Sequence, residues 1–242
     1  MTNVDESVGS EDQSDEKPQE ETRKKSMPLW QETILLLGLA LVLALIIKTL
    51  FVQAFYIPSP SMEPLFIKND RILVQKVSYW GGSTPSRGDI IVFKDPGGWL
   101  NESDTATPQG PVTKLMEKVG LYPTGGHLVK RVIGVGGDRV VCCDAKGRLT
   151  VNGKALNEKA YLPKGTAASQ LKFDRTVPKE HLWMMGDNRS FSLDSRGHMG
   201  DPGGGFVSED LVVGKVFTLI WPWQRAEFVH RPGTFEDIPE SK

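Results

Sequence analysis

The sequence predicts a mostly β protein with antiparallel strand pairing, preceded by one long apolar helix. A single long apolar run lies near the N-terminus, and short runs rich in β-branched and aromatic residues follow it. Gly, Pro and Asn turns separate these short runs, and no long helical pattern alternates with them. A doubly wound parallel sheet requires such alternation, so this fold class is disfavoured.

The composition suits one globular domain with a sizeable core. The chain has 242 residues, of which 39% are hydrophobic and 24% are charged. Its formal net charge of -1 and pI near 6.4 give no cationic footprint, so we expect no nucleic-acid partner.

Metal and cofactor motifs are also missing from the sequence. Four scattered histidines and one adjacent cysteine pair lack the ligand spacing of a zinc site. The "GVGGD" segment at 134–138 lacks the full dinucleotide fingerprint and precedes a strand pattern. We therefore expect no metal and no cofactor.

Residues 1–26 are expected to form a disordered acidic tail, because they contain almost nothing that could pack into a core. Arg23, Lys24 and Lys25 come just before the apolar run. Positively charged residues beside a membrane span favour the cytoplasmic side. We therefore expect a cytoplasmic tail, with the rest of the chain exported beyond the span.

Residues 27–56 are expected to form a transmembrane helix. Every residue from Ile34 to Ile47 is apolar or Gly, and Trp30 and Tyr56 flank the run. Such a segment can cross a hydrocarbon core of roughly 30 Å. A cleavable signal peptide would have a shorter apolar core and a nearby small-residue cleavage site, which fit this run badly. A buried core helix is the other alternative, although the run is longer than such a helix needs.

The β domain is expected over residues 57–225, with a surface insertion around 95–126 and a C-terminal tail over 226–242. The insertion is rich in Gly, Pro and Thr, and only its 112–121 stretch could form a short helix. The Asn-Gly dipeptide at 152–153 is the strongest hairpin signal. The expected strands lie within residues 70–79, 88–95, 127–141, 147–156, 181–187 and 210–223.

Two serines occupy a proline-stiffened turn just after the apolar run. In "FYIPSPSMEPL", at 55–65, Ser59 and Ser61 alternate with three prolines, which preset φ and limit the freedom of the turn. A hydroxyl that bonds the nearby backbone is the ordinary reading of such a serine. A serine nucleophile would need a base within reach. The chain has no G-x-S-x-G elbow and no motif around its histidines, which disfavours a Ser-His-Asp triad.

Lys130 is the candidate base. It lies in an apolar strand pattern, close to Val129 and Val132. A lysine among apolar neighbours loses the hydration that its charge needs, so its pKa falls and it can accept a proton. The alternative is a lysine on an edge strand, exposed to water.

Four motifs occur in a characteristic order. They are "IPSPSMEPL" at 57–65, "RGDIIVF" at 87–93, "KRVIGVGGD" at 130–138 and "GDNRSFSLDSRGHMG" at 186–200. Together they resemble the sequence boxes of bacterial type I signal peptidases, and the last motif is highly specific. The resemblance covers most of the chain and implies a catalytic domain built on a coiled, barrel-like antiparallel sheet.

The resemblance also implies a role for individual residues. Ser61 matches the family's nucleophile and Lys130 its general base. Ser59 matches the residue whose hydroxyl forms the oxyanion hole together with the Ser61 backbone N–H. Ser192 matches the serine that orients the lysine. The other matches are a frame around the site, Arg131, Asp187, Asp194 and Arg196, and shallow apolar substrate pockets made by Phe55, Ile57, Pro58, Met62, Leu128 and Val129.

The implied function is a membrane-bound serine endopeptidase that cleaves N-terminal signal peptides from exported preproteins. The implied partners are signal peptides of secreted preproteins, the phospholipid membrane and, functionally, the protein export translocase. The implied location is the bacterial plasma membrane, with one span, a cytoplasmic N-terminus and an extracytoplasmic catalytic domain. The alternatives are a Ser/Lys peptidase specialised for a pilin or conjugation substrate, and a non-catalytic exported β-domain that binds partners.

Two features depart from the family pattern. Pro60 stands where many members have Gly. Proline lacks a backbone N–H, but the mechanism does not need the N–H at this position. Cys142 and Cys143 are adjacent and lie away from every motif. A vicinal disulfide and two reduced thiols are both compatible with the sequence.

Overall fold

The computed structural model describes residues 28–100 and 126–240. The expected disordered tail, and most of the expected insertion with its candidate helix at 112–121, lie outside the described residues. The chain divides into two compact units, Met1–Val42 and Leu43–Lys242.

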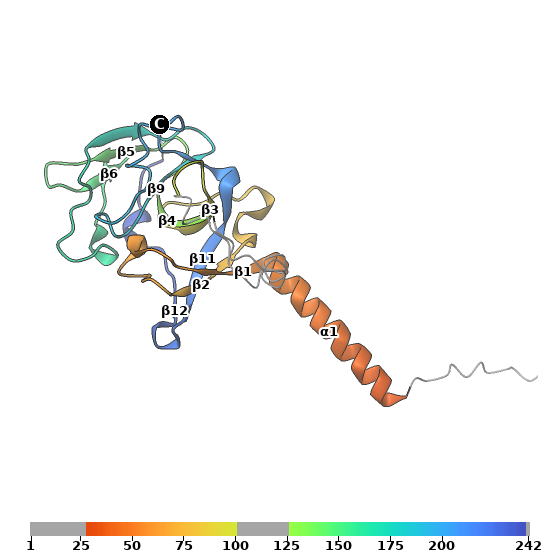
Figure 1. Cartoon of the computed structure of the whole chain (residues 1–242). Coiled ribbons are helices and arrows are strands. Elements are labelled where there is room, and N and C mark those ends of the chain that lie inside the picture. The colour runs from red at the N-terminus through yellow and green to blue at the C-terminus, as the bar shows by residue number, and fades with distance from the viewer. Residues whose placement is uncertain (1–27, 101–125, 241–242) are drawn as a thin grey trace, which may run out of the picture. The chain divides into compact units, whose positions relative to one another are not determined.

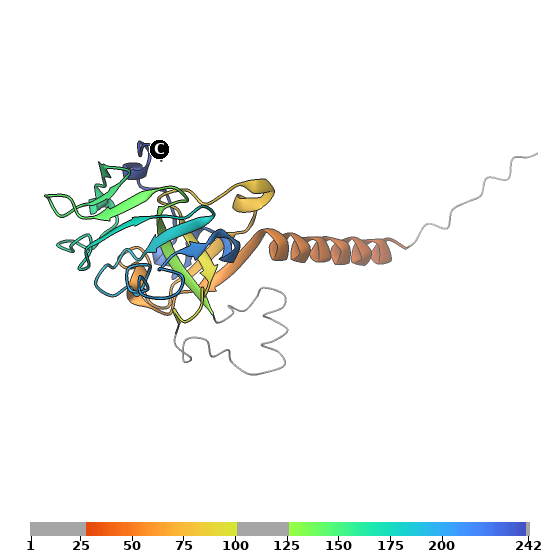
Figure 2. The same cartoon turned by 90° about the horizontal axis from the view of Figure 1, so that it is seen from above.

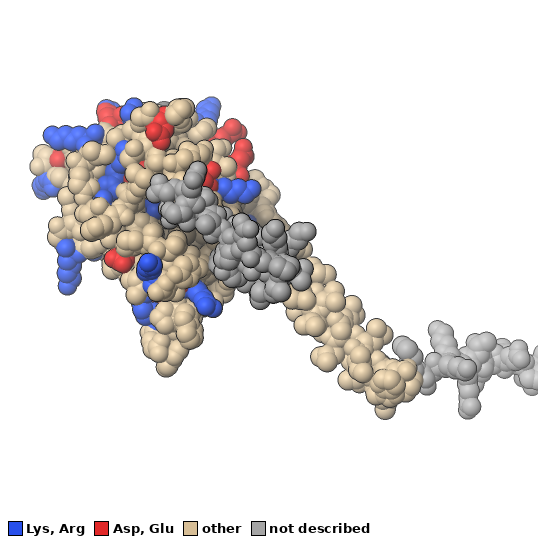
Figure 3. Space-filling model, in the orientation of Figure 1, with Lys and Arg blue, Asp and Glu red and all other residues tan. Residues whose placement is uncertain are grey.

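Helix α1 spans Leu29–Phe51 and contains most of the apolar run. Its segment Leu29–Ile47 has a mean hydropathy of 2.2. Within the described residues, this is the helix whose length and composition suit a membrane span. The part of α1 that is visible in Figure 3 is tan, without the blue or red of charged side chains.

The helix ends five residues earlier than the sequence predicted. Residues Val52–Tyr56 form strand β1 instead of a last helical turn. This strand pairs antiparallel with β2 (Arg71–Gln75) over five residue pairs, from Val52 opposite Gln75 to Tyr56 opposite Arg71. The β-branched and aromatic residues of this segment favour a strand, and pairing with β2 satisfies their backbone groups. The β domain therefore begins before Ile57.

One antiparallel sheet of eight strands contains most of the expected strands. Its order is β1-β2-β11-β3-β4-β9-β10, and β12 pairs with β11. The sheet curls, as Figures 1 and 2 show, which confirms the predicted coiled, antiparallel and mostly β fold. The remaining strands of this sheet are β3 (Ile90–Lys94), β4 (His127–Gly134), β9 (His181–Met185), β10 (Val207–Ser208), β11 (Val212–Trp221) and β12 (Glu227–Phe228).

A second antiparallel sheet of four strands has the order β7-β6-β5-β8. The hairpin predicted at 152–153 connects β6 to β7, and Asn152 adopts a positive φ of 51° there. Strand β8 was not predicted, because only Phe173 of its four residues is apolar and two of the others are charged. The strands are β5 (Arg139–Cys142), β6 (Leu149–Val151), β7 (Lys154–Ala155) and β8 (Phe173–Thr176).

The C-terminal segment is not the tail that the sequence predicted. Strand β12 pairs with β11, and the Val229 backbone N–H donates to the Phe217 carbonyl oxygen. Phe235 and Ile238 are buried in the core that also contains the second sheet. Burial of these two side chains favours packing over a free tail, so residues up to 240 belong to the β domain.

The alternation of β1 across the sheet gives a direct test of the corrected helix end. Phe55 is 4% exposed and Tyr56 is 39% exposed. We expect Phe55→Ala to lower the free energy of unfolding by about 3–5 kcal/mol, because it leaves a cavity in the core. Tyr56→Ala is the matched control and should cost much less. Equal losses in a chemical unfolding experiment would contradict the strand assignment.

Candidate active site

The turn that carries the two serines is a 3-10 helix, η1 (Pro60–Met62), directly after β1. Pro60 sits at its first position, where a missing N–H costs no helical hydrogen bond. Ser61 and Met62 are buried. The backbone N–H of Asn188 donates to the Ser61 carbonyl oxygen at 3.0 Å, and the Asn188 amide donates to the Pro60 carbonyl oxygen at 3.2 Å. Asn188 therefore fixes the turn against the loop after β9.

Lys130 lies on β4, paired with Ile91 of β3, and its side chain points to the serine turn. Its Nζ donates to Ser61 Oγ at 2.7 Å, although 69 residues separate the two in the chain. The side chain is only 4% exposed. Burial lowers the Lys130 pKa from its ordinary value near 10.5 to about 8, against the opposing effect of the carboxylates of Asp194 and Asp187. The two residues that the sequence predicted as nucleophile and base are therefore in contact.

Ser59 lies beside the same hydroxyl. Its Oγ is 3.1 Å from Ser61 Oγ, and its backbone is extended, with φ of -123° and ψ of 157°. Ser59 is an exposed residue, and its hydroxyl contacts the hydroxyl of the buried Ser61.

Ser192 has a different partner from the one that the resemblance implied. Its Oγ donates to Asp194 Oδ2 at 2.7 Å, and no hydrogen bond joins it to Lys130 among the described residues. It still lies close to the serine turn, because a Cβ added to Gly186 would be 2.2 Å from Ser192 Oγ and 2.5 Å from the Ser61 carbonyl oxygen. Ser192 therefore lies next to the serine turn, and its hydroxyl is hydrogen-bonded to the Asp194 carboxylate.

Asp194 and Arg196 form one of the buried ion pairs around the site. Arg196 donates to both carboxylate oxygens at 2.8 Å, and the Gly186 N–H donates to Asp194 at 3.0 Å. Burial opposes the charged form of Asp194, but the hydrogen bonds from Arg196, Gly186 and Ser192 hold its pKa below the ordinary value. Asp194 is therefore a carboxylate anion, and both of its oxygens already accept hydrogen bonds.

Arg131 and Asp187 form the second buried ion pair. Arg131 Nε and Nη2 donate to the two oxygens of Asp187 at 2.7 and 2.6 Å. Arg131 also donates to the Gly88 carbonyl oxygen at 2.9 Å, and its guanidinium lies 4.4 Å from the centre of the Tyr161 ring. Both side chains are almost completely inaccessible to solvent. The pair ties β4 to the start of the loop after β9.

The six predicted substrate-pocket residues do not form one group. Phe55, Ile57 and Met62 are buried in one cluster, and Val129 packs against them from β4. Leu128 packs in another cluster, together with Ile91 and Phe93, because neighbouring strand residues face opposite sides of the sheet.

Pro58 lies on the surface of the turn. The apolar cluster that contains Met62, the neighbour of Ser61 in the chain, thus does not include Leu128.

One buried ion pair near the site was not predicted. Arg189 donates to Glu158 and, at 2.6 Å, to the Ala168 carbonyl oxygen. Arg189 lies within the last motif, but Glu158 comes from a different part of the chain and has no motif of its own. Only the folded structure brings the two together.

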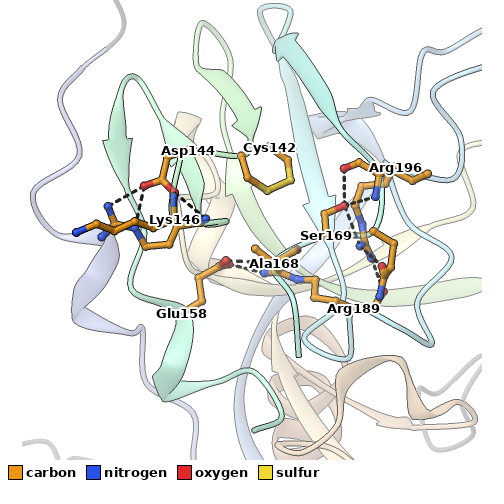
Figure 4. The surroundings of a disulfide bond; sticks show 12 residues. Cys142, Asp144, Lys146, Glu158, Ala168, Ser169, Arg189 and Arg196 are labelled. Atoms are coloured by element: carbon orange, nitrogen blue, oxygen red, sulfur yellow. Dashed lines mark hydrogen bonds and ion pairs between the residues drawn. A yellow bond between two sulfur atoms is a disulfide. The ribbon is translucent and has the colours of Figure 1, made fainter. Parts of the chain in front are cut away.

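The cysteine pair, which the sequence left open, forms a disulfide between Cys142 and Cys143. Figure 4 shows it near the loop that carries Ala168 and Ser169. Arg189 and Arg196 donate to this loop, so the second sheet is connected to the frame of the site. The disulfide contributes no atom to the contact between Ser61 and Lys130.

Known proteins of one family are similar to this chain over most of its length. The family model described as signal peptidase, peptidase S26, matches residues 30–221. A probable signal peptidase I of Mycobacterium leprae is 37% identical over 233 residues, covering 84% of this chain and 79% of the relative. The signal peptidase I of Mycobacterium tuberculosis is 35% identical over 230 residues, covering 85% of this chain and 77% of the relative.

A solved structure of a signal peptidase I from Enterococcus faecalis is also similar. It is 26% identical, with a TM-score of 0.35, and the match covers 55% of this chain and 97% of that one.

The matches to the family model and to the two mycobacterial relatives place the chain among the proteases. More specifically, the chain belongs to the signal peptidase family, peptidase S26.

The frame of the site can be tested by removing one carboxylate. We expect Asp187→Ala to lower the free energy of unfolding by about 3–5 kcal/mol, because it leaves the buried Arg131 guanidinium without a counter-charge. Asp174→Ala is the matched control, since Asp174 pairs with Arg139 in water. Chemical unfolding that shows the same small loss for both variants would contradict the structural role of the buried pair.

Proposed function

We propose that this protein is a membrane-anchored signal peptidase in which Ser61 is the nucleophile and Lys130 the general base. The observation that carries the proposal is the 2.7 Å contact between the buried Lys130 Nζ and Ser61 Oγ. Family membership and the names of the relatives support the substrate class, N-terminal signal peptides of exported preproteins.

The first step is acylation of Ser61. The neutral Lys130 amine accepts the hydroxyl proton as Ser61 Oγ attacks the carbonyl carbon of the scissile peptide bond. The resulting oxyanion accepts hydrogen bonds from the Ser59 hydroxyl and the Ser61 backbone N–H. The Lys130 ammonium then gives its proton to the leaving amine, which releases the mature protein and leaves the signal peptide as an ester on Ser61.

The second step is hydrolysis of this ester. Lys130, neutral again, takes a proton from water as the water attacks the ester carbonyl, and the same oxyanion donors act a second time. Lys130 returns the proton to Ser61 as the signal peptide departs. A pKa of about 8 suits both roles, because the amine and the ammonium are then both accessible near neutral pH.

The remaining residues position these groups. Ser192, held by Asp194, is proposed to orient Lys130 as the lysine changes charge. The apolar side chains of Phe55, Ile57 and Val129 are proposed to accept small side chains in the signal peptide before the cleaved bond. Family membership and the positions of the side chains support these roles.

The membrane anchor and its orientation belong to the same proposal. Helix α1 is long and apolar enough to span a bilayer, and the basic triplet before it favours a cytoplasmic N-terminus. The protein is then anchored in the bacterial plasma membrane by this helix. Its catalytic domain lies outside the cytoplasm, where preproteins leave the export translocase. The cleavage site of a membrane-inserted signal peptide would be presented to Ser61 at this surface.

Cleavage of a preprotein with an Ala-x-Ala site by the detergent-solubilised full chain tests the function. We expect Ser61→Ala and Lys130→Ala each to reduce the rate by about 10⁴-fold or more, and the double variant to be scarcely slower, because the two groups act as a unit. Lys130→Arg should also fail, because a guanidinium stays charged and cannot accept the proton. Lys164→Arg, at an exposed position, is the matched control.

The outcomes separate the alternatives. Substantial turnover by Lys130→Arg would refute Lys130 as the base. A wild-type protein that cleaves only pilin or conjugation precursors would favour the specialised peptidase. A wild-type protein that cleaves none of these substrates would favour the binding module.

A further inference from the structure

A polar pocket lies beside the 3-10 segment η2 (Val77–Gly82), and none of its lining residues belongs to the candidate active site. Its volume is about 540 Å³. Five hydroxyl side chains line it, contributed by Ser78, Tyr79, Ser83, Thr84 and Ser86. The pocket is thus rich in groups that donate hydrogen bonds.

Three charged side chains meet in the wall of this pocket. Lys215 and Arg231 both bind the same oxygen of Asp89, each at 2.8 Å. Asp89 is 3% exposed, whereas the Lys215 and Arg231 side chains are 28% and 39% exposed. The cluster therefore carries one net positive charge, and its two cations, unlike its carboxylate, are accessible from solvent.

The rim of the pocket contains hydroxyls that the fold does not use. Within the described residues, no hydrogen bond involves the side chains of Ser83 or Thr84, and both residues are exposed. Two cations surrounded by hydroxyl donors form an arrangement that suits a phosphate group, whose oxygens accept several charge-assisted hydrogen bonds.

The pocket lies close to the end of the apolar helix. The Lys76 backbone N–H donates to the Phe51 carbonyl oxygen at 2.9 Å, and the rings of Phe51 and Trp80 are 5.6 Å apart. Phe51 is four helical residues beyond the candidate span, which ends at Ile47. Four residues correspond to about 6 Å, which is roughly the thickness of the headgroup layer on one side of a bilayer. The residues beside the pocket are therefore at headgroup depth, given the proposed membrane anchor.

We propose that this pocket binds a phosphate group, supplied by the headgroup of an anionic phospholipid. Lys215 and Arg231 contact the phosphate, and the hydroxyls at the rim donate to its oxygens or to headgroup hydroxyls. The net positive charge selects an anionic headgroup over a zwitterionic one. The inference depends on the membrane anchor of the proposed function, but not on its catalytic chemistry.

The test is amide hydrogen exchange of residues 77–89 in the full chain, reconstituted in nanodiscs of phosphatidylcholine with or without phosphatidylglycerol. We expect the anionic lipid to slow exchange of this segment about tenfold when the lipid is at ten times its Kd, because bound protein must release the headgroup before it opens. Thr84→Glu should abolish the effect, since it places a carboxylate at the rim and removes no hydrogen bond. Thr176→Glu, at an exposed position on β8, is the matched control and should keep the protection.

A parallel arm uses the full chain in a neutral detergent with inorganic phosphate. Protection by inorganic phosphate, without an effect of phosphatidylglycerol, would overturn the lipid as the source. No protection in either arm, or the same protection in Thr84→Glu as in the wild type, would overturn the proposal that this pocket binds a phosphate group. Preprotein cleavage is measured in the same samples, so a failed pocket with intact cleavage is distinguished from a failure of the proposed function.

Discussion

The structure of the site depends on one constraint, a lysine buried beside a serine hydroxyl with no carboxylate of the described residues in direct contact. Burial removes the water that stabilises an ammonium ion, so the pKa of Lys130 falls. A carboxylate paired with the lysine would reverse this effect. The two nearby carboxylates, Asp187 and Asp194, instead form ion pairs with arginines. These arginine pairs leave the lysine to contact Ser61, so the contact depends on the ion pairs as well as on burial.

The curled sheet brings these groups together from three distant parts of the chain. Lys130 lies on β4, which is held on both sides by β3 and β9. The serine turn follows the edge strand β1, and the loop after β9 closes over that turn through Asn188. Close packing at this junction requires glycine at 186, because any Cβ there would overlap Ser192 and the Ser61 carbonyl oxygen. Backbone hydrogen bonds thus connect β4 to β9, and the loop after β9 to the serine turn.

The sequence predicts the parts of this structure that depend on local pattern. The strand runs and the hairpin turn carry signals within a few residues of themselves, and the structure contains them. Ser61 and Lys130 also lie in local motifs, and their side chains are in contact in the structure. The predictions that failed concern segments that are decided by tertiary contacts. β1 is a strand because β2 pairs with it, and the segment around Phe235 is ordered because the core buries it. The partner of Arg189 was not predicted either, because Glu158 has no signal in the sequence that links it to the site.

The charge of the Lys130 side chain tests the proposed mechanism most directly. NMR titration of the full chain with ¹³C-labelled lysines measures the pKa of Lys130, whose signal is assigned by its loss in Lys130→Ala. We predict a pKa of about 8, so that cleavage rises with pH through this value as the amine becomes neutral. A pKa at or above the ordinary lysine value of about 10.4 would contradict this mechanism, because Lys130 would then be charged at neutral pH and unable to act as the base.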